Sequence, residues 1–264
     1  MLPSSILAFL SVIAVSSASP LRRRCNDTTV INPPKPPDTP SPPAGVTPTL
    51  PVSGGETELD GPGNISLKHI AVGHGIQNYT CAAAGQRATA TGALAVLWDI
   101  EQLYPGSGPS SISEADWTEL SPKVLRTTEL PLNLLSGSAT EYAADPQVPF
   151  PPDADLELEG VEAKLKFLGH HYFDGVGTPT FDLRGDASRP VFRGKKDASV
   201  SAPATADRGL TGSGAVDWLR LTDKGTSAGV SVVYRVYTAG GNPAPCGEAG
   251  QAESVPYTAM YWFY

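Results

Sequence analysis

The sequence contains few charged residues, and this scarcity limits the kinds of partner it is suited to bind. Lys, Arg, Asp and Glu make up 17% of its 264 residues, compared with about 25% in ordinary soluble domains. The balance is acidic, with a formal net charge of −8 at pH 7. Because nucleic-acid backbones are bound by basic surfaces, this balance argues against nucleic acid as a partner.

The glycine motifs of the sequence do not indicate a nucleotide-dependent enzyme or a serine hydrolase. Residues 73–78 and 212–217 each contain Gly-x-Gly, but both lack the third glycine of a dinucleotide-binding turn. The pattern Gly-x-Ser-x-Gly occurs at residues 225–229, but this stretch lies between two expected strands, whereas a nucleophile elbow joins a strand to a helix. It therefore predicts no cofactor and no serine-hydrolase site.

The apolar run near the N-terminus is too short to span a bilayer. It covers residues 6–15 and is followed by the small residues Ser16, Ser17 and Ala18. This length and order are typical of a secretory signal peptide. We expect residues 1–18 to be a signal peptide, the protein to be secreted and extracellular, and no transmembrane segment to be present.

Residues 19–60 are rich in proline and have too few apolar residues to form a core. Nine prolines lie among Thr, Ser and Gly between residues 33 and 51, a composition that favours extended, disordered chain. The segment is predicted to be a linker, acting either as a spacer or simply as a disordered tail. Residues 22–24 are all Arg, which indicates either a basic processing site or a short solvated charge run.

Residues 61–264 are predicted to form a single domain of mainly β structure. Gly and Pro are abundant, with 27 and 26 residues, and short apolar segments alternate with turn formers. We expect an antiparallel sandwich or flattened barrel with a few short helices. The expected strands are residues 67–72, 76–81, 165–173, 178–183, 217–221, 230–238 and the apolar C-terminus, with a turn at 73–75.

Two further segments of this domain are less regular. Residues 93–100 form a dense apolar run that suits either a strand or a helix. Ser113 precedes an acidic, helix-like segment and is a candidate N-cap. Residues 136–155 are proline-rich and are expected to be an irregular insertion between strands.

The sequence has three cysteines, of which only Cys81 and Cys246 lie in the predicted domain. In an oxidising compartment a disulfide between them is the default expectation. Pairing of Cys25 with either one stays open. Three Asn-x-Ser/Thr acceptors, at Asn26, Asn64 and Asn78, predict a glycoprotein.

The four histidines offer only a weak catalytic or metal site. His170 and His171 are adjacent on an expected strand and therefore face opposite sides. One of them would have to meet His74 and a carboxylate such as Asp174. Spacing alone does not distinguish a pair of catalytic carboxylates from surface charge, and no metal site is predicted.

Four motifs carry a resemblance to a known family. They are GxGxQNYxC at 73–81, GHHYF at 169–173, VDWLxL at 216–221, and VYRV, TAGG, PC and VPYxAxYWFY within 233–264. Over residues 65–264 the chain resembles a family of secreted, mostly filamentous-fungal proteins of unknown function, often labelled "malate dehydrogenase". The missing glycine motif does not support that activity. The resemblance implies no catalytic residues, and its shared cysteines favour the Cys81–Cys246 bridge.

The sequence leaves two hypotheses for function. The first is a non-enzymatic extracellular or cell-wall-associated glycoprotein, with wall polysaccharide or another extracellular component as its partner. The alternative is an extracellular enzyme with a His/carboxylate site that acts on carbohydrate or another small substrate.

Overall fold

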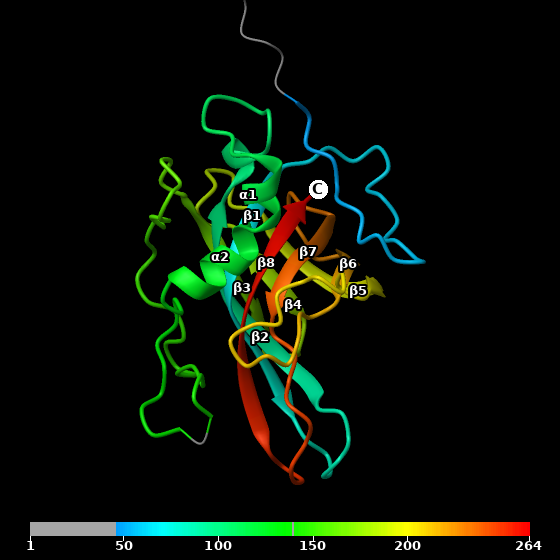
Figure 1. Cartoon of the computed structure of the whole chain (residues 1–264), viewed down its shortest axis with the longest axis vertical. Helices are drawn as coiled ribbons and strands as arrows, with labels where there is room; N and C mark the ends of the chain where they lie inside the picture. Colours follow the sequence, from blue (N-terminus) through cyan, green and yellow to red (C-terminus); the bar gives the residue numbers. More distant parts are fainter. Residues whose placement is uncertain (1–45, 139) are drawn as a thin grey trace, which may run out of the picture. The chain divides into compact units, whose positions relative to one another are not determined.

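The computed structural model describes residues 46–138 and 140–264, and eight antiparallel strands in this part close into a barrel (Figure 1). Each strand pairs with the next one along the chain, as in a meander. The elements are β1 (His69–Thr80), β2 (Thr89–Asp99), η1 (Glu101–Leu103), α1 (Glu114–Thr118), α2 (Leu120–Thr127), β3 (Phe167–Phe173), β4 (Pro179–Asp182), β5 (Val191–Val200), β6 (Trp218–Asp223), β7 (Val232–Gly240) and β8 (Ala252–Phe263).

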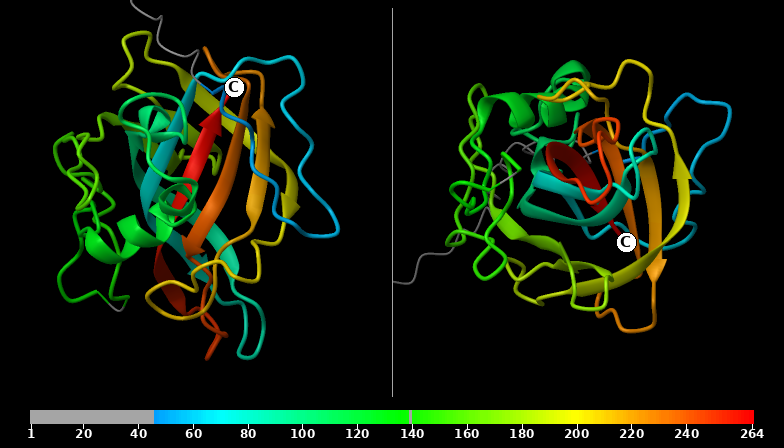
Figure 2. Two further views of the ribbon diagram at one scale, coloured as in Figure 1. Left: turned by 45° about the horizontal axis from the view of Figure 1, so that its top comes forward. Right: turned by 90° about the horizontal axis from the view of Figure 1, so that it is seen from below.

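The barrel closes where β8 pairs with β1 on one side and with β7 on the other. Phe263 is in register with His69 of β1 and with Val233 of β7. Closure leaves no free sheet edge among the eight strands, and the right view of Figure 2 shows the resulting ring of strands. The prediction of a mainly β, antiparallel fold with a few short helices is confirmed, in its barrel form.

Alternation along the strands places apolar side chains on both faces of the sheet. An inner cluster fills part of the barrel and includes Leu97, Phe181, Phe192 and Phe263. Successive side chains of a strand point to opposite faces, so the intervening residues form a second cluster outside the barrel. Residues 230–238 are apolar on both faces because one face packs in the inner cluster and the other in the outer cluster.

The outer cluster is covered by the two helices and the irregular chain between β2 and β3. Trp117 of α1 and Val124 of α2 are buried against Trp262 and neighbouring residues. The Ser113 hydroxyl accepts a hydrogen bond from the Asp116 amide at 3.1 Å, so it caps α1 as predicted. Both helices lie against one side of the barrel (Figure 1).

Residues 69–80 form one continuous strand, so the expected turn at residues 73–75 is wrong. Gly73 and Gly75 allow close packing instead. A Cβ at Gly73 would lie 2.7 Å from the Tyr261 ring, and one at Gly75 would lie 1.8 Å from the Leu94 carbonyl oxygen. Glycine therefore serves here for close approach of neighbouring strands rather than for chain reversal.

Two other segments differ from the sequence-based expectation. The strand β5 was not predicted, because its second half is polar and largely exposed. Residues 46–60, expected to belong to a linker, contact the barrel: the Thr49 amide donates to the Tyr104 hydroxyl and the Tyr234 hydroxyl donates to the Asp60 carbonyl. Residues 93–100 lie largely in β2, which resolves the strand-or-helix ambiguity.

The predicted signal peptide, the basic run at 22–24, Cys25 and Asn26 lie outside the described residues. Within residues 46–138 and 140–264, no helix combines the length and apolar character needed to cross a membrane.

Substitution of Gly75 tests the close approach of β1 and β2. Gly75→Ala should lower the free energy of unfolding by about 2–3 kcal/mol, because its methyl group must displace the β2 backbone. Gly92→Ala is the matched control in β2, where the added carbon would meet only the Phe173 side chain at 3.8 Å. Chemical denaturation of both variants measures the difference. Equal stabilities would show that β1 and β2 are not packed as described.

Candidate functional site

A cavity of about 410 Å³ opens at one end of the barrel. Its wall includes residues from β1 to β8 and from the two loops that follow β1 and β7. The inner apolar cluster leaves this end of the barrel unfilled. Eight-stranded barrels of this kind have room for one small ligand, and barrel mouths are a common place for such sites.

A disulfide holds the two loops beside this cavity together. The sulfur atoms of Cys81 and Cys246 lie 2.10 Å apart, so the pairing expected from the sequence is present. Backbone hydrogen bonds reinforce it, since the Cys81 amide donates to Gln251 and the Gly85 amide donates to the Cys246 carbonyl. The loops meet at the lower end in Figure 1. Their cavity-lining residues are Arg87, Ala88, Asn242 and Pro243.

His171 lies on the inner face of β3 and lines the cavity. Its Nδ1 atom donates to the Thr180 carbonyl oxygen at 2.9 Å, so in the neutral ring Nε2 is an acceptor. Burial lowers the pKa of His171 to about 4. The ring stacks on Phe181, with centroids 4.1 Å apart. His171 is therefore a neutral, oriented acceptor at physiological pH.

Gln77 is a buried polar side chain in the cavity wall with an unused donor. Its Nε2 atom makes no hydrogen bond with any described residue. Nearby, the Tyr257 and Tyr261 hydroxyls are 2.7 Å apart and form a hydrogen bond. Burial raises the pKa of both phenols, so both stay protonated. The Gln77 amide lies near the Tyr257 hydroxyl and lowers the pKa of that phenol, against the larger effect of burial.

The charges that line the cavity are mainly positive. Its lining contains three cationic side chains, those of Arg87, Lys196 and Arg235, and one carboxylate, that of Asp217. Arg235 is held in place by its Nε and Nη2 atoms, which donate to the Asp217 carbonyl oxygen at 3.1 and 2.8 Å. The site can therefore bind an anionic group at its mouth and an apolar group further inside.

The structure does not bring together the histidines and the carboxylate that the sequence offered as a candidate catalytic site. His74 and His170 lie on the outer face of the sheet, because both are in register with Val96 from opposite sides. Two strand spacings separate them, roughly 10 Å. His171 lies on the inner face, as the adjacent positions require. The Asp174 carboxylate accepts from the Val176 and Thr178 amides and so caps an exposed turn.

His74 and His170 each have a local structural role instead. The His74 Nδ1 atom lies 3.0 Å from the Thr258 hydroxyl oxygen. His170 stacks on Phe150 with centroids 4.0 Å apart. Burial lowers the pKa of each histidine to about 4. No group of three or more His, Cys, Asp or Glu side chains suited to a metal ion occurs within the described ranges.

The sequence analysis missed most of the cavity residues, among them Gln77, Lys196, Arg235 and Tyr261. In an alternating strand, a polar residue that faces a wet barrel interior looks the same as one that faces solvent. One signal for these residues was available in the sequence. Gln77 and Arg235 are polar, whereas the other residues on the same face of each strand are mostly apolar. Only closure of the barrel shows that these positions converge.

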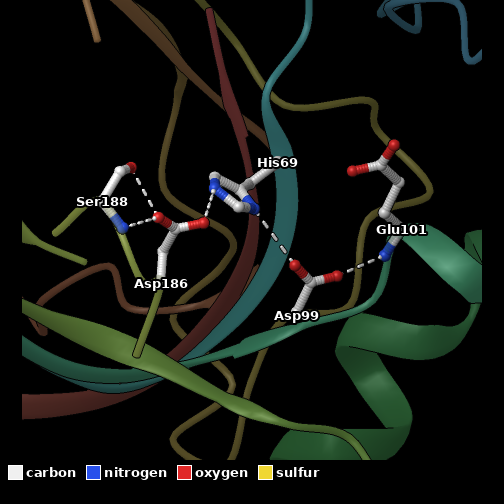
Figure 3. Close-up of polar contacts among 5 residues, drawn as sticks. All are labelled: His69, Asp99, Glu101, Asp186 and Ser188. Atoms are coloured by element: carbon white, nitrogen blue, oxygen red, sulfur yellow. Dashed lines mark hydrogen bonds and ion pairs between the residues drawn. The ribbon is translucent and has the colours of Figure 1, made fainter. Parts of the chain in front are cut away.

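A second polar cluster surrounds His69, the first residue of β1, whereas the cavity is lined by Gln77 and Tyr79 near the other end of that strand. Figure 3 shows this cluster. His69 Nδ1 is 3.2 Å from an Asp99 carboxylate oxygen, and its Nε2 is 3.3 Å from an Asp186 oxygen. Asp99 also accepts from the Glu101 amide, and Asp186 from the Ser188 amide and hydroxyl. Only a protonated imidazole donates to both carboxylates. The hydrogen bond to Asp99 is the main cause of a raised His69 pKa.

The sequence of residues 62–264 matches the model of a family described as "Protein of unknown function (DUF3455)". No curated protein and no solved structure matches the chain.

The His69 cluster predicts a pH-dependent contribution to stability. A raised pKa means that protonated His69 stabilises the fold fully below its unfolded value of about 6.5. This contribution, about 1 kcal/mol for a partly solvated charged pair, is lost as pH rises through the folded pKa. Denaturation of the wild type and His69→Gln from pH 5 to 9 should show their difference shrinking.

Titration of the His69 ring by NMR supplies the direct measurement. Asp186→Asn should lower the His69 pKa, whereas Asp174→Asn, which removes a turn carboxylate with no histidine partner, should leave it unchanged. A His69 pKa at or below 6.5 would contradict the assignment.

Proposed function

The chain belongs to the DUF3455 family, and because the family's description assigns no activity, we propose a function from the cavity itself. The protein is a secreted, non-enzymatic extracellular protein that binds a small molecule in the mouth of its barrel. The observation that carries this proposal is the cavity of about 410 Å³ at one end of the barrel, whose lining combines apolar side chains with three cationic ones. That volume lies within the usual range for small-ligand sites, about 300–1,000 Å³.

The way in which His171 is held supports binding rather than catalysis. Its Nδ1 atom donates to a backbone carbonyl, not to a carboxylate that would stabilise an imidazolium. A general base works best with a pKa near the operating pH, whereas the pKa of His171 is about 4. The residue is better suited to accept a hydrogen bond from a ligand.

One observation favours the alternative of an extracellular enzyme with a His/carboxylate site. His171 and Asp217 line the same cavity. Chemical turnover of a bound molecule that His171→Gln abolishes would support the enzyme over the binding protein.

The proposed export route is supported by the apolar segment at residues 6–15 and by the Cys81–Cys246 bridge, since disulfides persist in oxidising compartments. Association with cell-wall polysaccharide is a finer proposal, and it is supported only by the Pro/Thr-rich composition of residues 19–60. Pull-down of the secreted protein on chitin and β-glucan tests it, and failure on both polymers would remove the wall association.

Secretion predicts a glycan at Asn64. This residue is exposed in a turn, whereas Asn78 is half-buried in β1 and its side-chain oxygen accepts from the Ser254 hydroxyl at 2.8 Å. The full-length chain should be recovered from the culture medium, and Asn64→Gln should reduce its mass by one glycan. Mass spectrometry before and after enzymatic deglycosylation measures this. Retention of an unglycosylated protein inside the cell would contradict secretion.

Blocking the cavity mouth tests small-molecule binding. Ala90 lines the mouth and is exposed, so Ala90→Trp should obstruct entry with little cost to stability. Binding of the neutral fluorescent probe N-phenyl-1-naphthylamine should weaken by about tenfold, the equivalent of ~1.4 kcal/mol. Ala84→Trp, in the loop that precedes β2 and outside the cavity wall, is the matched control. Equal probe binding by both variants would contradict the cavity as the binding site.

A further inference from the structure

The mouth of the cavity has a charge opposite to that of the whole protein. Three cationic side chains, Arg87, Lys196 and Arg235, line it together with one carboxylate, although the chain as a whole carries −8. Neither Arg87 nor Lys196 forms an ion pair or a side-chain hydrogen bond with a described residue. Such a local excess of positive charge attracts anions and repels cations.

Arg235 presents a free edge of its guanidinium group. Its Nε and Nη2 atoms are engaged by the Asp217 carbonyl oxygen. Nη1 has no hydrogen-bond partner among the described residues. The edge formed by Nη1 and the second hydrogen of Nη2 therefore remains available, and its planar geometry matches the two oxygens of a carboxylate.

The wall deeper in the cavity suits a flat, apolar body. His171 and Phe181 stack nearly parallel, at an angle of 10°. The Tyr261 ring meets Phe181 edge-on at 5.1 Å between centroids. Leu219 and Leu221 add aliphatic surface from β6. These rings are almost fully buried and form the base of the wall, so the apolar surface open to a ligand belongs to Phe173 and Leu219. Flat unsaturated groups pack well against an exposed ring face such as that of Phe173.

The same cavity contains one unpaired donor and one unpaired acceptor. The Gln77 Nε2 atom donates to no described residue, and the His171 Nε2 atom is left as an acceptor by the bond from Nδ1. A hydroxyl group both accepts and donates, so ligand hydroxyls satisfy both kinds of atom. The cavity volume corresponds to about 14 water-sized groups, which limits the ligand to a small organic molecule.

The geometry points to a small, flat, hydroxylated carboxylic acid as the ligand. Its carboxylate binds at the mouth beside Arg235, Lys196 and Arg87, its unsaturated body lies against Phe173 and Leu219, and its hydroxyl group reaches Gln77. This inference rests on the proposed function, because it specifies the ligand of the same cavity.

Three related probes test the ligand class by isothermal titration calorimetry on the full-length secreted protein. They are 4-hydroxycinnamate, cinnamate without the hydroxyl group, and the neutral methyl ester of 4-hydroxycinnamate. At pH 7, 4-hydroxycinnamate should bind about tenfold more tightly than the ester, because only the anion forms charge-assisted hydrogen bonds. It should also bind more tightly than cinnamate, and its affinity should fall as salt is added.

Paired variants separate a local contact from a general charge effect. Lys196 lines the cavity, whereas Lys195 is the neighbouring exposed residue of β5 and does not. Lys196→Gln should weaken binding of 4-hydroxycinnamate about two- to fivefold, as for an exposed ion pair, and Lys195→Gln should not. Gln77→Leu should remove the preference for 4-hydroxycinnamate over cinnamate without changing the preference for the anion over the ester.

The outcomes distinguish this inference from the proposed function. Equal affinity for the acid and its ester, equal effects of the two lysine variants, or no binding of 4-hydroxycinnamate would each overturn the carboxylate class. The neutral fluorescent probe reports on the cavity independently of charge. If its binding is also insensitive to Ala90→Trp, small-molecule binding in the barrel fails as well.

Discussion

The rest of the structure depends on the pairing of β8 with both β1 and β7. This pairing turns an eight-stranded meander into a barrel and satisfies the backbone groups that would otherwise lie at two free edges. It requires close approach at the middle of β1, where Gly73 leaves room for the Tyr261 ring of β8. The C-terminal apolar residues are thus structural, and their burial on both faces follows from their central place in the sheet.

This arrangement produces an outer core and an inner core. The inner core does not fill the whole barrel, and the space that it leaves is the cavity. The outer core is covered by α1, α2 and the irregular chain between β2 and β3. The inner core is continuous from the end where Phe263 lies to the cavity, where Phe181, Leu221 and Tyr261 form part of the wall. Around the cavity, polar and charged residues join the apolar ones, and the disulfide holds the adjoining loops together. The cavity is therefore a consequence of where the inner apolar side chains stop.

The two ends of the barrel differ in charge as well as in packing. At one end, carboxylates surround His69 and favour its protonated form. At the other, cationic side chains outnumber the single carboxylate around the cavity. In a protein with an acidic balance, this local excess of positive charge attracts anions to the cavity mouth, which the net charge would not suggest.

The sequence by itself indicated most of the strands and the helix cap at Ser113, and it favoured the pairing of Cys81 with Cys246, because alternation, capping residues and cysteine number are local or countable features. It missed β5 and left residues 93–100 open between strand and helix. It also indicated the opposite facing of His170 and His171. It did not determine the continuous β1, where Gly73 and Gly75 suggested a turn, or the convergence of Gln77, His171 and Arg235. Those features depend on register between strands up to about 190 residues apart, which a single sequence does not encode in any local pattern. Closure and the cavity were decided only by the tertiary structure, since a polar side chain inside a barrel and one in solvent follow the same alternation.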